Sequence, residues 1–183
     1  MNKSVKPTNT PEFWLRRIYD TLARGRDLHT IIYDTDYNTW QQIQNSTAGI
    51  LDNLLSPGMK FLDAGCGYGA AYEAWQQYDS LKDVEYVGLD LSPDLLEIAK
   101  IRVLDIERPL FTLILGDIRN IPFPNGHFDF VMCRSIKGMV QDNSGDEEWN
   151  LVWKELNRVA RKILLIEYGD VAGYKVIPSD SAG

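Results

Sequence analysis

One stretch of ten residues limits the possible folds of this chain more than any other feature. Residues 61–70 read Phe-Leu-Asp-Ala-Gly-Cys-Gly-Tyr-Gly-Ala, and the apolar start is typical of the end of a buried strand. The apolar residues that come next recur with the spacing of one helix face: Ala71, Ala74, Trp75 and Tyr78. The pattern predicts a strand over 59–64, a glycine turn and a helix over 69–79. Because glycine has no Cβ, such a turn lets a ligand approach the backbone closely.

The position of Asp63 narrows the choice of ligand. The carboxylate comes two residues before Gly65, in the spacing Asp-x-Gly-x-Gly-x-Gly. A negative charge there attracts a ligand that carries positive charge, whereas a diphosphate has no use for it. Gly65-x-Gly67-x-x-Ala70 also fits the loose dinucleotide fingerprint, so a nicotinamide cofactor stays open. A third interpretation is that Asp63 only caps the following helix.

The stretch closely resembles the first motif of the class I S-adenosylmethionine-dependent methyltransferases. The resemblance implies S-adenosylmethionine as cofactor and places Asp63, Gly65, Cys66 and Gly67 beside it. It covers about residues 59–168. A full member of that family has a seven-stranded sheet that ends in an antiparallel pair, and few residues remain here after 168 to form one. We therefore expect a shortened C-terminal end of the sheet.

Strands and helices alternate from residue 59 onward. Further strands are predicted at 84–90, 110–115, 128–133, 163–166 and 173–177, with helices that start near 92 and cover 149–159. Apolar strands separated by helices indicate an α/β fold: a Rossmann-like parallel sheet with helices on both faces. The whole chain, 1–183, is read as one domain with its core at 59–177. An uncovered edge at 163–166 would favour a homodimer or a partner subunit there.

The first 55 residues are predicted to form a helical cap over the glycine turn. One helix begins at 10–12, where Thr-Pro-Glu supplies a cap, a proline and an acid, and another covers 39–55. Residues 10–55 are too polar to be needed for the core of the sheet. We expect 29–40 to act as a lid that becomes ordered with cofactor. Tyr33 and Trp40 would then line the substrate side, and His29 is a weak candidate for a general base.

Strand ends supply the remaining candidates, because ligands of open α/β sheets bind beyond the carboxyl ends of the strands. Asp90 ends the second strand and can accept hydrogen bonds from both ribose hydroxyls, with Leu91 packing on adenine. The alternative is that Asp90 is only an acid at a helix start. By the resemblance, Asp117 would accept a hydrogen bond from the adenine amino group and Ile118 would pack on the ring; otherwise Asp117 caps a turn.

The fourth strand ends in Cys133-Arg134-Ser135. By the resemblance this position faces the methionine part of the cofactor and the substrate, so the Cys133 backbone and Ser135 are candidates. Arg134 either binds an acidic substrate or pairs with a surface acid, and the second interpretation is favoured. His127 precedes the strand, at the opposite end of the sheet, and is interpreted as a turn residue.

Composition and net charge limit the classes of partner that the protein is expected to bind. The 183 residues carry a net charge of −7 with a sequence pI of about 4.8, which argues against a broad grip on nucleic acid. Two cysteines form no disulfide or metal-binding pattern and suit a reducing compartment, no apolar run approaches the roughly 20 residues of a membrane span, and a cytoplasmic location is expected. We predict S-adenosylmethionine-dependent methyl transfer to an unidentified small molecule. The alternatives are a noncatalytic methyltransferase-like partner subunit and a nicotinamide-dependent oxidoreductase.

Overall fold

A computed structural model describes residues 37–103, 110–166 and 174–179. The chain divides into two compact units, 1–43 and 44–183, and all the strands belong to the second. The helix expected from residue 10 and the residues His29 and Tyr33 lie outside the described residues. The predicted lid therefore falls largely outside them as well.

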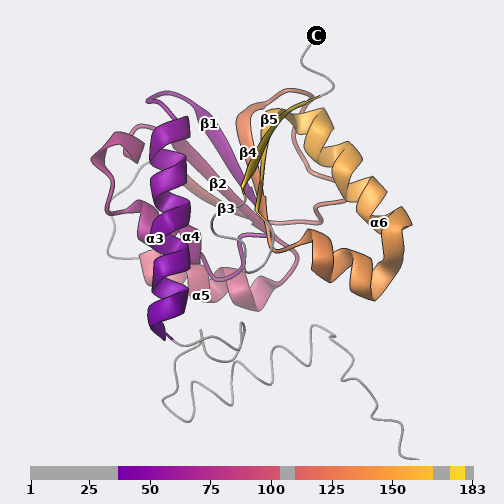
Figure 1. Cartoon of the computed structure of the whole chain (residues 1–183), viewed down its shortest axis with the longest axis horizontal. Helices are drawn as coiled ribbons and strands as arrows, with labels where there is room; N and C mark the ends of the chain where they lie inside the picture. The colour runs from indigo at the N-terminus through magenta and orange to yellow at the C-terminus, as the bar shows by residue number, and fades with distance from the viewer. Residues whose placement is uncertain (1–36, 104–109, 167–173, 180–183) are drawn as a thin grey trace, which may run out of the picture. The chain divides into compact units, whose positions relative to one another are not determined.

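A six-stranded sheet organises the described residues, in the order β3-β2-β1-β4-β5-β6 (Figure 1). The strands are β1 Lys60–Ala64, β2 Glu85–Asp90, β3 Phe111–Leu115, β4 Phe128–Arg134, β5 Ala160–Ile166 and β6 Lys175–Pro178. The first five are parallel, which confirms the predicted α/β fold. Strand β6 pairs antiparallel with β5 and covers its outer edge. Among the described strands β6 therefore covers Lys162–Leu165 of β5, and the expected association at that end of the sheet stays a prediction.

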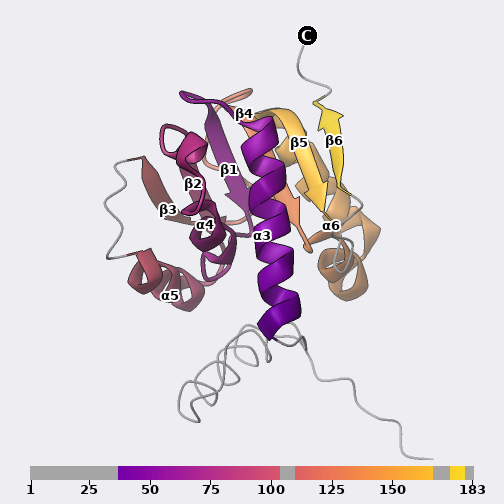
Figure 2. The same ribbon diagram turned by 60° about the vertical axis from the view of Figure 1, so that its left-hand side comes forward.

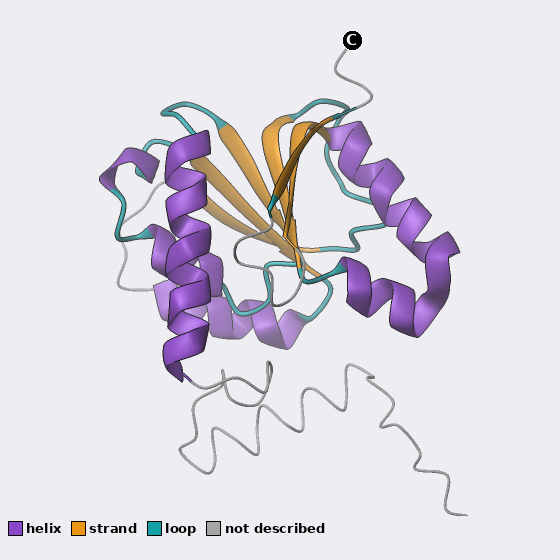
Figure 3. Ribbon diagram, in the orientation of Figure 1, coloured by secondary structure: helices purple, strands orange, loops and turns teal. Residues whose placement is uncertain are grey.

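One described helix precedes β1, and three others lie between successive parallel strands, whereas a loop joins β3 to β4 (Figure 3). They are α3 Tyr37–Leu54, α4 Ala70–Trp75, α5 Pro93–Val103 and α6 Lys137–Val159, with a short 3-10 turn η1 at Asp79–Leu81. Helix α4 is shorter than predicted, because the chain turns after Trp75 and the Trp75 indole donates to the Leu81 carbonyl at 3.1 Å. Helix α6 is longer than predicted and kinks at Gly145, where φ is 85° and ψ is 178°.

Two apolar clusters cover the two faces of the sheet. One contains Leu62 and Ala64 of β1 together with Val152 and Leu156 of α6. The other cluster contains residues from α3, α4, β1 and β2: Leu51, Trp75, Phe61 and Tyr86. Because side chains alternate along a strand, successive residues of β1 supply opposite faces. Figure 2 shows α3 in front of the sheet.

Helix α3 contributes directly to the core, contrary to the expectation from its composition. Three buried residues recur at helical spacing: Ala48, Leu51 and, directly after the helix, Leu55. Leu51 and Leu55 belong to the second of the two apolar clusters. The expectation that residues 10–55 are not needed for the core of the sheet is therefore wrong for this part. Because the other faces of the helix are polar, its narrow apolar stripe was hard to recognise in the sequence.

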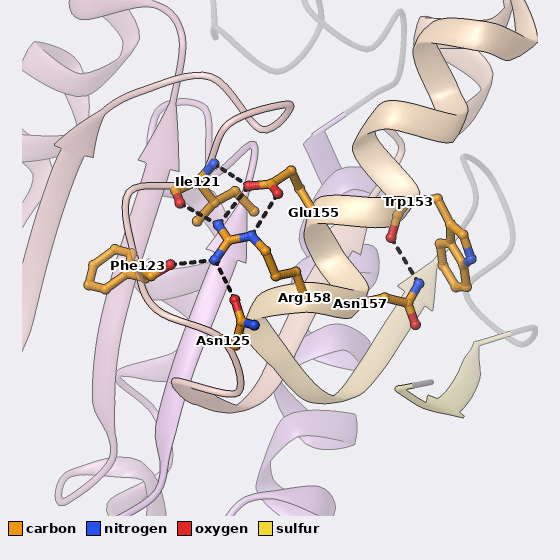
Figure 4. Close-up of polar contacts among 7 residues, drawn as sticks. All are labelled: Ile121, Phe123, Asn125, Trp153, Glu155, Asn157 and Arg158. Carbon is orange, nitrogen blue, oxygen red and sulfur yellow. Dashed lines mark hydrogen bonds and ion pairs between the residues drawn. The ribbon is translucent and has the colours of Figure 1, made fainter. Parts of the chain in front are cut away.

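Arg158 of α6 fastens the loop that joins β3 to β4 (Figure 4). Its guanidinium donates to the carbonyls of Ile121 at 2.8 Å and Phe123 at 2.7 Å, and to the Asn125 side chain at 3.2 Å. Glu155 accepts from Arg158 and also from the Ile121 N–H at 2.8 Å. The loop is thus bound to α6 through its backbone groups, one of which, the Ile121 carbonyl, also accepts from the Phe123 N–H at 2.8 Å.

Candidate functional site

The glycine turn has the geometry that the spacing predicts. Gly65, Gly67 and Gly69 have φ values of 81°, 55° and 78°, a region that side chains other than glycine rarely adopt. The Gly67 N–H donates to an Asp90 carboxylate oxygen at 2.8 Å. A Cβ at Gly65 would lie 2.5 Å from the end of the Ile136 side chain, which would have to move to make room for it. The turn therefore brings the ends of β1 and β2 together.

Asp90 is half-buried and fixed in orientation at the end of β2. Its two carboxylate oxygens accept from the backbone N–H groups of Gly67 at 2.8 Å and Ser92 at 2.9 Å. Burial raises the pKa of Asp90, while these backbone hydrogen bonds lower it. The hydroxyl of Ser92, and not Asp90, accepts from the Leu95 N–H at the start of α5. Asp90 is thus more than an acid at a helix start, because it also binds the glycine turn.

Asp63 is buried, with only 3% of its surface exposed. One oxygen accepts from the Tyr86 hydroxyl at 2.7 Å. Burial raises the pKa of Asp63 to about 6, while the nearby charge of Arg134 and the Tyr86 hydrogen bond oppose the rise. Helix α4 has Gly69 at its N-cap and no side-chain cap, so Asp63 does not cap it. Tyr86 was not among the predicted site residues, since its contact depends on the register of β1 against β2.

Arg134 ends β4 and reaches helix α3. Its Nη1 donates to the Gln44 side chain at 2.7 Å and to the Thr47 hydroxyl at 3.3 Å. In the part of the chain that the structure describes, no carboxylate forms an ion pair with it, although its charge acts on Asp63. Within these residues Arg134 binds uncharged partners, and the favoured expectation that it pairs with a surface acid stays a prediction. Gln44 and Thr47 gave no sequence signal, because their contact joins residues far apart in the chain.

The two residues that flank Arg134 in the chain, Cys133 and Ser135, differ in backbone conformation and in burial. Ser135 has a left-handed φ of 59°, uncommon for a residue other than glycine, and its N–H donates to the Ile166 carbonyl at 2.8 Å. Cys133 is fully buried and belongs to the cluster that contains Val152 and Leu156 of α6. Cys66 is buried too, and its backbone N–H donates to the Leu89 carbonyl at 3.1 Å.

Asp117 lies beyond β3 and is held by Arg119. The guanidinium contacts one carboxylate oxygen of Asp117 at 2.9 Å from Nε and 2.5 Å from Nη2, and the same side chain reaches Glu148 of α6 at 2.8 Å. These bonds lower the pKa of Asp117. Leu91 is 60% exposed and accessible to a ligand, whereas Ile118 packs partly against the core. Arg119 was missed by sequence reasoning, although its place two residues after Asp117 permits the contact.

The strand ends bring together one part of the predicted set. Asp63, Asp90 and Arg134 have the same parity on adjacent strands, so their side chains share one face of the sheet. The side chain of Trp40 lies outside the described part of α3, as do His29 and Tyr33. In the described ranges no group of side chains has the make-up of a metal site, and no helix is long and apolar enough to cross a membrane.

Comparison with known proteins gives a consistent picture. A family model described as a methyltransferase domain matches residues 62–163. A ubiquinone/menaquinone biosynthesis C-methyltransferase of Laribacter hongkongensis is 28% identical over 84% of this chain and 59% of its own. An uncharacterized methyltransferase of Synechocystis is 42% identical over 44% of this chain and 34% of its own. The chain thus spans between a third and three fifths of the length of these two relatives.

A solved structure shares the fold. It is a TehB-like S-adenosylmethionine-dependent methyltransferase from Corynebacterium glutamicum, 20% identical, with a TM-score of 0.52. The match covers 88% of this chain and 78% of that one. At this identity the likeness concerns the arrangement of strands and helices, and it agrees with the Rossmann-like sheet of this chain.

Proposed function

The chain belongs to the methyltransferase-domain family, and from that premise we propose that it transfers the methyl group of S-adenosylmethionine to a small organic acceptor. The observation that carries the proposal is the fixed carboxylate of Asp90. Two backbone N–H groups orient it at the end of β2, directly beside the glycine turn. A carboxylate has further lone pairs, so Asp90 can still accept from ribose hydroxyls.

The residues present fit the cofactor. Asp63 offers negative charge at the end of β1, and the glycine turn leaves room for close approach of a ligand to the backbone. Leu91 offers an exposed apolar surface beside Asp90 for a ring. Asp117 is ionised and held in place by Arg119, which suits a hydrogen bond from an amino group. Together with Asp90, these features correspond to the charged, sugar and base parts of S-adenosylmethionine.

S-adenosylmethionine supplies a methyl group that is already activated by the adjacent sulfonium charge. When bound, it would give that methyl group to the acceptor atom, the carbon–sulfur electron pair would stay on the neutral thioether, and the proton of the acceptor would be released to solvent. The protein then contributes mainly alignment, which can account for a large part of a rate enhancement. That the methyl acceptor is a small molecule is part of this proposal. Because one relative is named as a quinone C-methyltransferase, an electron-rich ring carbon is the first acceptor to test.

The first experiment is a titration of the purified protein with S-adenosylhomocysteine and, separately, with NAD, followed by calorimetry and thermal unfolding. A ligand that binds only the native state raises the melting temperature. We expect a rise with S-adenosylhomocysteine and none with NAD. A rise with NAD alone would support the nicotinamide-dependent oxidoreductase instead. Binding of neither ligand would support a noncatalytic partner subunit.

A further inference from the structure

A single residue, Arg119, holds the carboxylate of Asp117 through both its backbone and its side chain. The backbone N–H of Arg119 donates to Oδ1 at 2.8 Å, and Nη2 donates to Oδ2 at 2.5 Å. Nε lies between the two oxygens, 3.0 Å from Oδ1 and 2.9 Å from Oδ2. A carboxylate has about four lone-pair sites, so these donors fix its plane and leave room for a donor from a ligand.

Helix α6 in turn fixes the guanidinium of Arg119. Nη1 donates to Glu148 at 2.8 Å, so each of the three nitrogens has a carboxylate acceptor. Glu148 and Glu155 are about two helical turns apart and therefore lie on the same side of α6. Glu155 accepts from the Ile121 N–H, in the same loop as Arg119. Helix α6 thus contacts the β3–β4 loop at two points, and Arg119 is held at one of them.

The two contacts differ in what they fix. Arg158 donates to the carbonyls of Ile121 and Phe123, so it fixes the backbone of the loop (Figure 4). Arg119 fixes the side chain of Asp117, which is 29% exposed and lies just beyond the carboxyl end of β3. Ligands of open α/β sheets bind at that edge. The contact with Arg119 therefore orients a carboxylate that a ligand can reach.

We propose that Arg119 is a positioning residue, which orients Asp117 so that the protein selects adenine over hypoxanthine in the base of its cofactor. The inference rests on the proposed function and adds Arg119 and Glu148 to the residues that serve it. The amino group of adenine can donate to the carboxylate, whereas hypoxanthine has an oxygen there. That oxygen would meet a second acceptor in a group with one net negative charge, since Asp117 and Glu148 outnumber Arg119. A carboxylate that is ordered beforehand also loses less freedom when the ligand binds.

The test compares S-adenosylhomocysteine with S-inosylhomocysteine, in which hypoxanthine replaces adenine. Calorimetry measures both affinities for the full chain, for Arg119→Gln, for Glu148→Ala and for Arg161→Gln. Arg161 is an exposed arginine of β5 paired with Asp129, so its substitution controls for the loss of one charge. We expect the unmodified protein to prefer S-adenosylhomocysteine by about 10- to 100-fold, as a hydrogen bond to a charged group allows.

Arg119→Gln should reduce this preference by about 3- to 10-fold, which corresponds to the cost of ordering one side chain on binding. Glu148→Ala should reduce it less, because Nε and Nη2 of Arg119 still hold Asp117. Arg161→Gln should leave the preference unchanged. A purely structural role of Arg119 would weaken both ligands equally and leave their ratio as it is, and that result would overturn the proposal.

A second comparison places Arg119→Gln in an Asp117→Asn background. Because Arg119 acts through Asp117, the added substitution should there change the preference by less than about twofold. A reduction as large as that in the unmodified protein would mean that Arg119 meets the base itself, and would overturn the positioning role.

If Arg119→Gln does not fold, Arg119→Lys keeps the charge without the fork and should still lower the preference, together with Glu148→Ala. An unchanged preference in both variants would overturn the proposal. An unmodified protein that binds both ligands equally overturns this inference alone. Binding of neither ligand overturns the proposed function as well.

Discussion

Asp63 is a carboxylate whose burial opposes folding. Its pKa in the folded protein is about 6, above the ordinary value of 3.8, chiefly because burial disfavours the charged form. Between these two pH values the folded state holds more protons than the unfolded state. The free energy of unfolding therefore falls as the pH rises through this window, and the full penalty applies above pH 6.

Asp63→Asn should consequently stabilise the ligand-free protein at about pH 7.5 by about 1–3 kcal/mol, since one pKa unit corresponds to about 1.4 kcal/mol. The amide oxygen can still accept from Tyr86. At about pH 4 the native carboxyl group is already protonated, so the gain should nearly disappear. Urea unfolding at both pH values measures the effect. An equal gain at both would show that the charge of Asp63 is not the cause.

Asp90→Ala should weaken S-adenosylhomocysteine binding by about 1.5–3 kcal/mol, the usual contribution of hydrogen bonds to a charged group. The substitution also leaves the Gly67 N–H without its acceptor. Asp94→Ala is the matched control, because Asp94 is an acid in the first turn of α5. Calorimetry of the two variants separates the roles. If both lose affinity equally, Asp90 acts only through the charge at the helix start.

Individual residues show what could be predicted at this scale. The glycines and Asp63 follow from spacing within one strand–turn unit, and Asp90 from its place at the end of the next strand, so local sequence was sufficient. Tyr86, Gln44 and Thr47 contact their partners only because strands and α3 pack in one particular register. Each of these contacts joins residues more than 20 positions apart in the chain, so no pattern within one segment indicates it.

At the scale of secondary-structure elements, helix α6 was also predicted only in part. Its second half has a strong apolar spacing and was predicted, whereas residues 137–148 are mostly polar and were not. Gly145, which would normally argue against a continuous helix, marks the kink between the two halves. Helix α4 ends at Trp75, before the 3-10 turn η1, where the Trp75 indole donates to the Leu81 carbonyl. This is a tertiary contact that periodicity cannot indicate.

Arg158 should be the surface residue on which the β3–β4 loop depends most. We expect Arg158→Ala to reduce the free energy of unfolding by about 1.5–3 kcal/mol, because two loop carbonyls and Glu155 lose a charged donor. Arg161→Ala should change it by less than about 0.5 kcal/mol, since an exposed ion pair contributes little. Denaturant unfolding compares the two. Similar losses would mean that the loop is held by other contacts.

At the scale of the whole molecule, alternation of strands and helices was sufficient to predict the parallel sheet. The prediction of the family then depended on the glycine-turn motif and on Asp90. Both lie in the first half of the core. The expected shortened C-terminal end is present as a single strand of four residues, β6, close to the predicted 173–177. Its antiparallel pairing with β5 depends on tertiary packing.

The strand order also has a consequence for how the chain reaches its native state. Strand β1 lies between β2 and β4, and Phe61 pairs with Phe130 across a long separation in sequence. During synthesis on a ribosome, β1, β2 and β3 emerge first and leave one apolar edge of β1 without a neighbour. Pairings between distant residues close slowly, and an open edge invites association with other nascent chains. Closure of β4 onto β1 is thus the step at which a chaperone would protect this protein most.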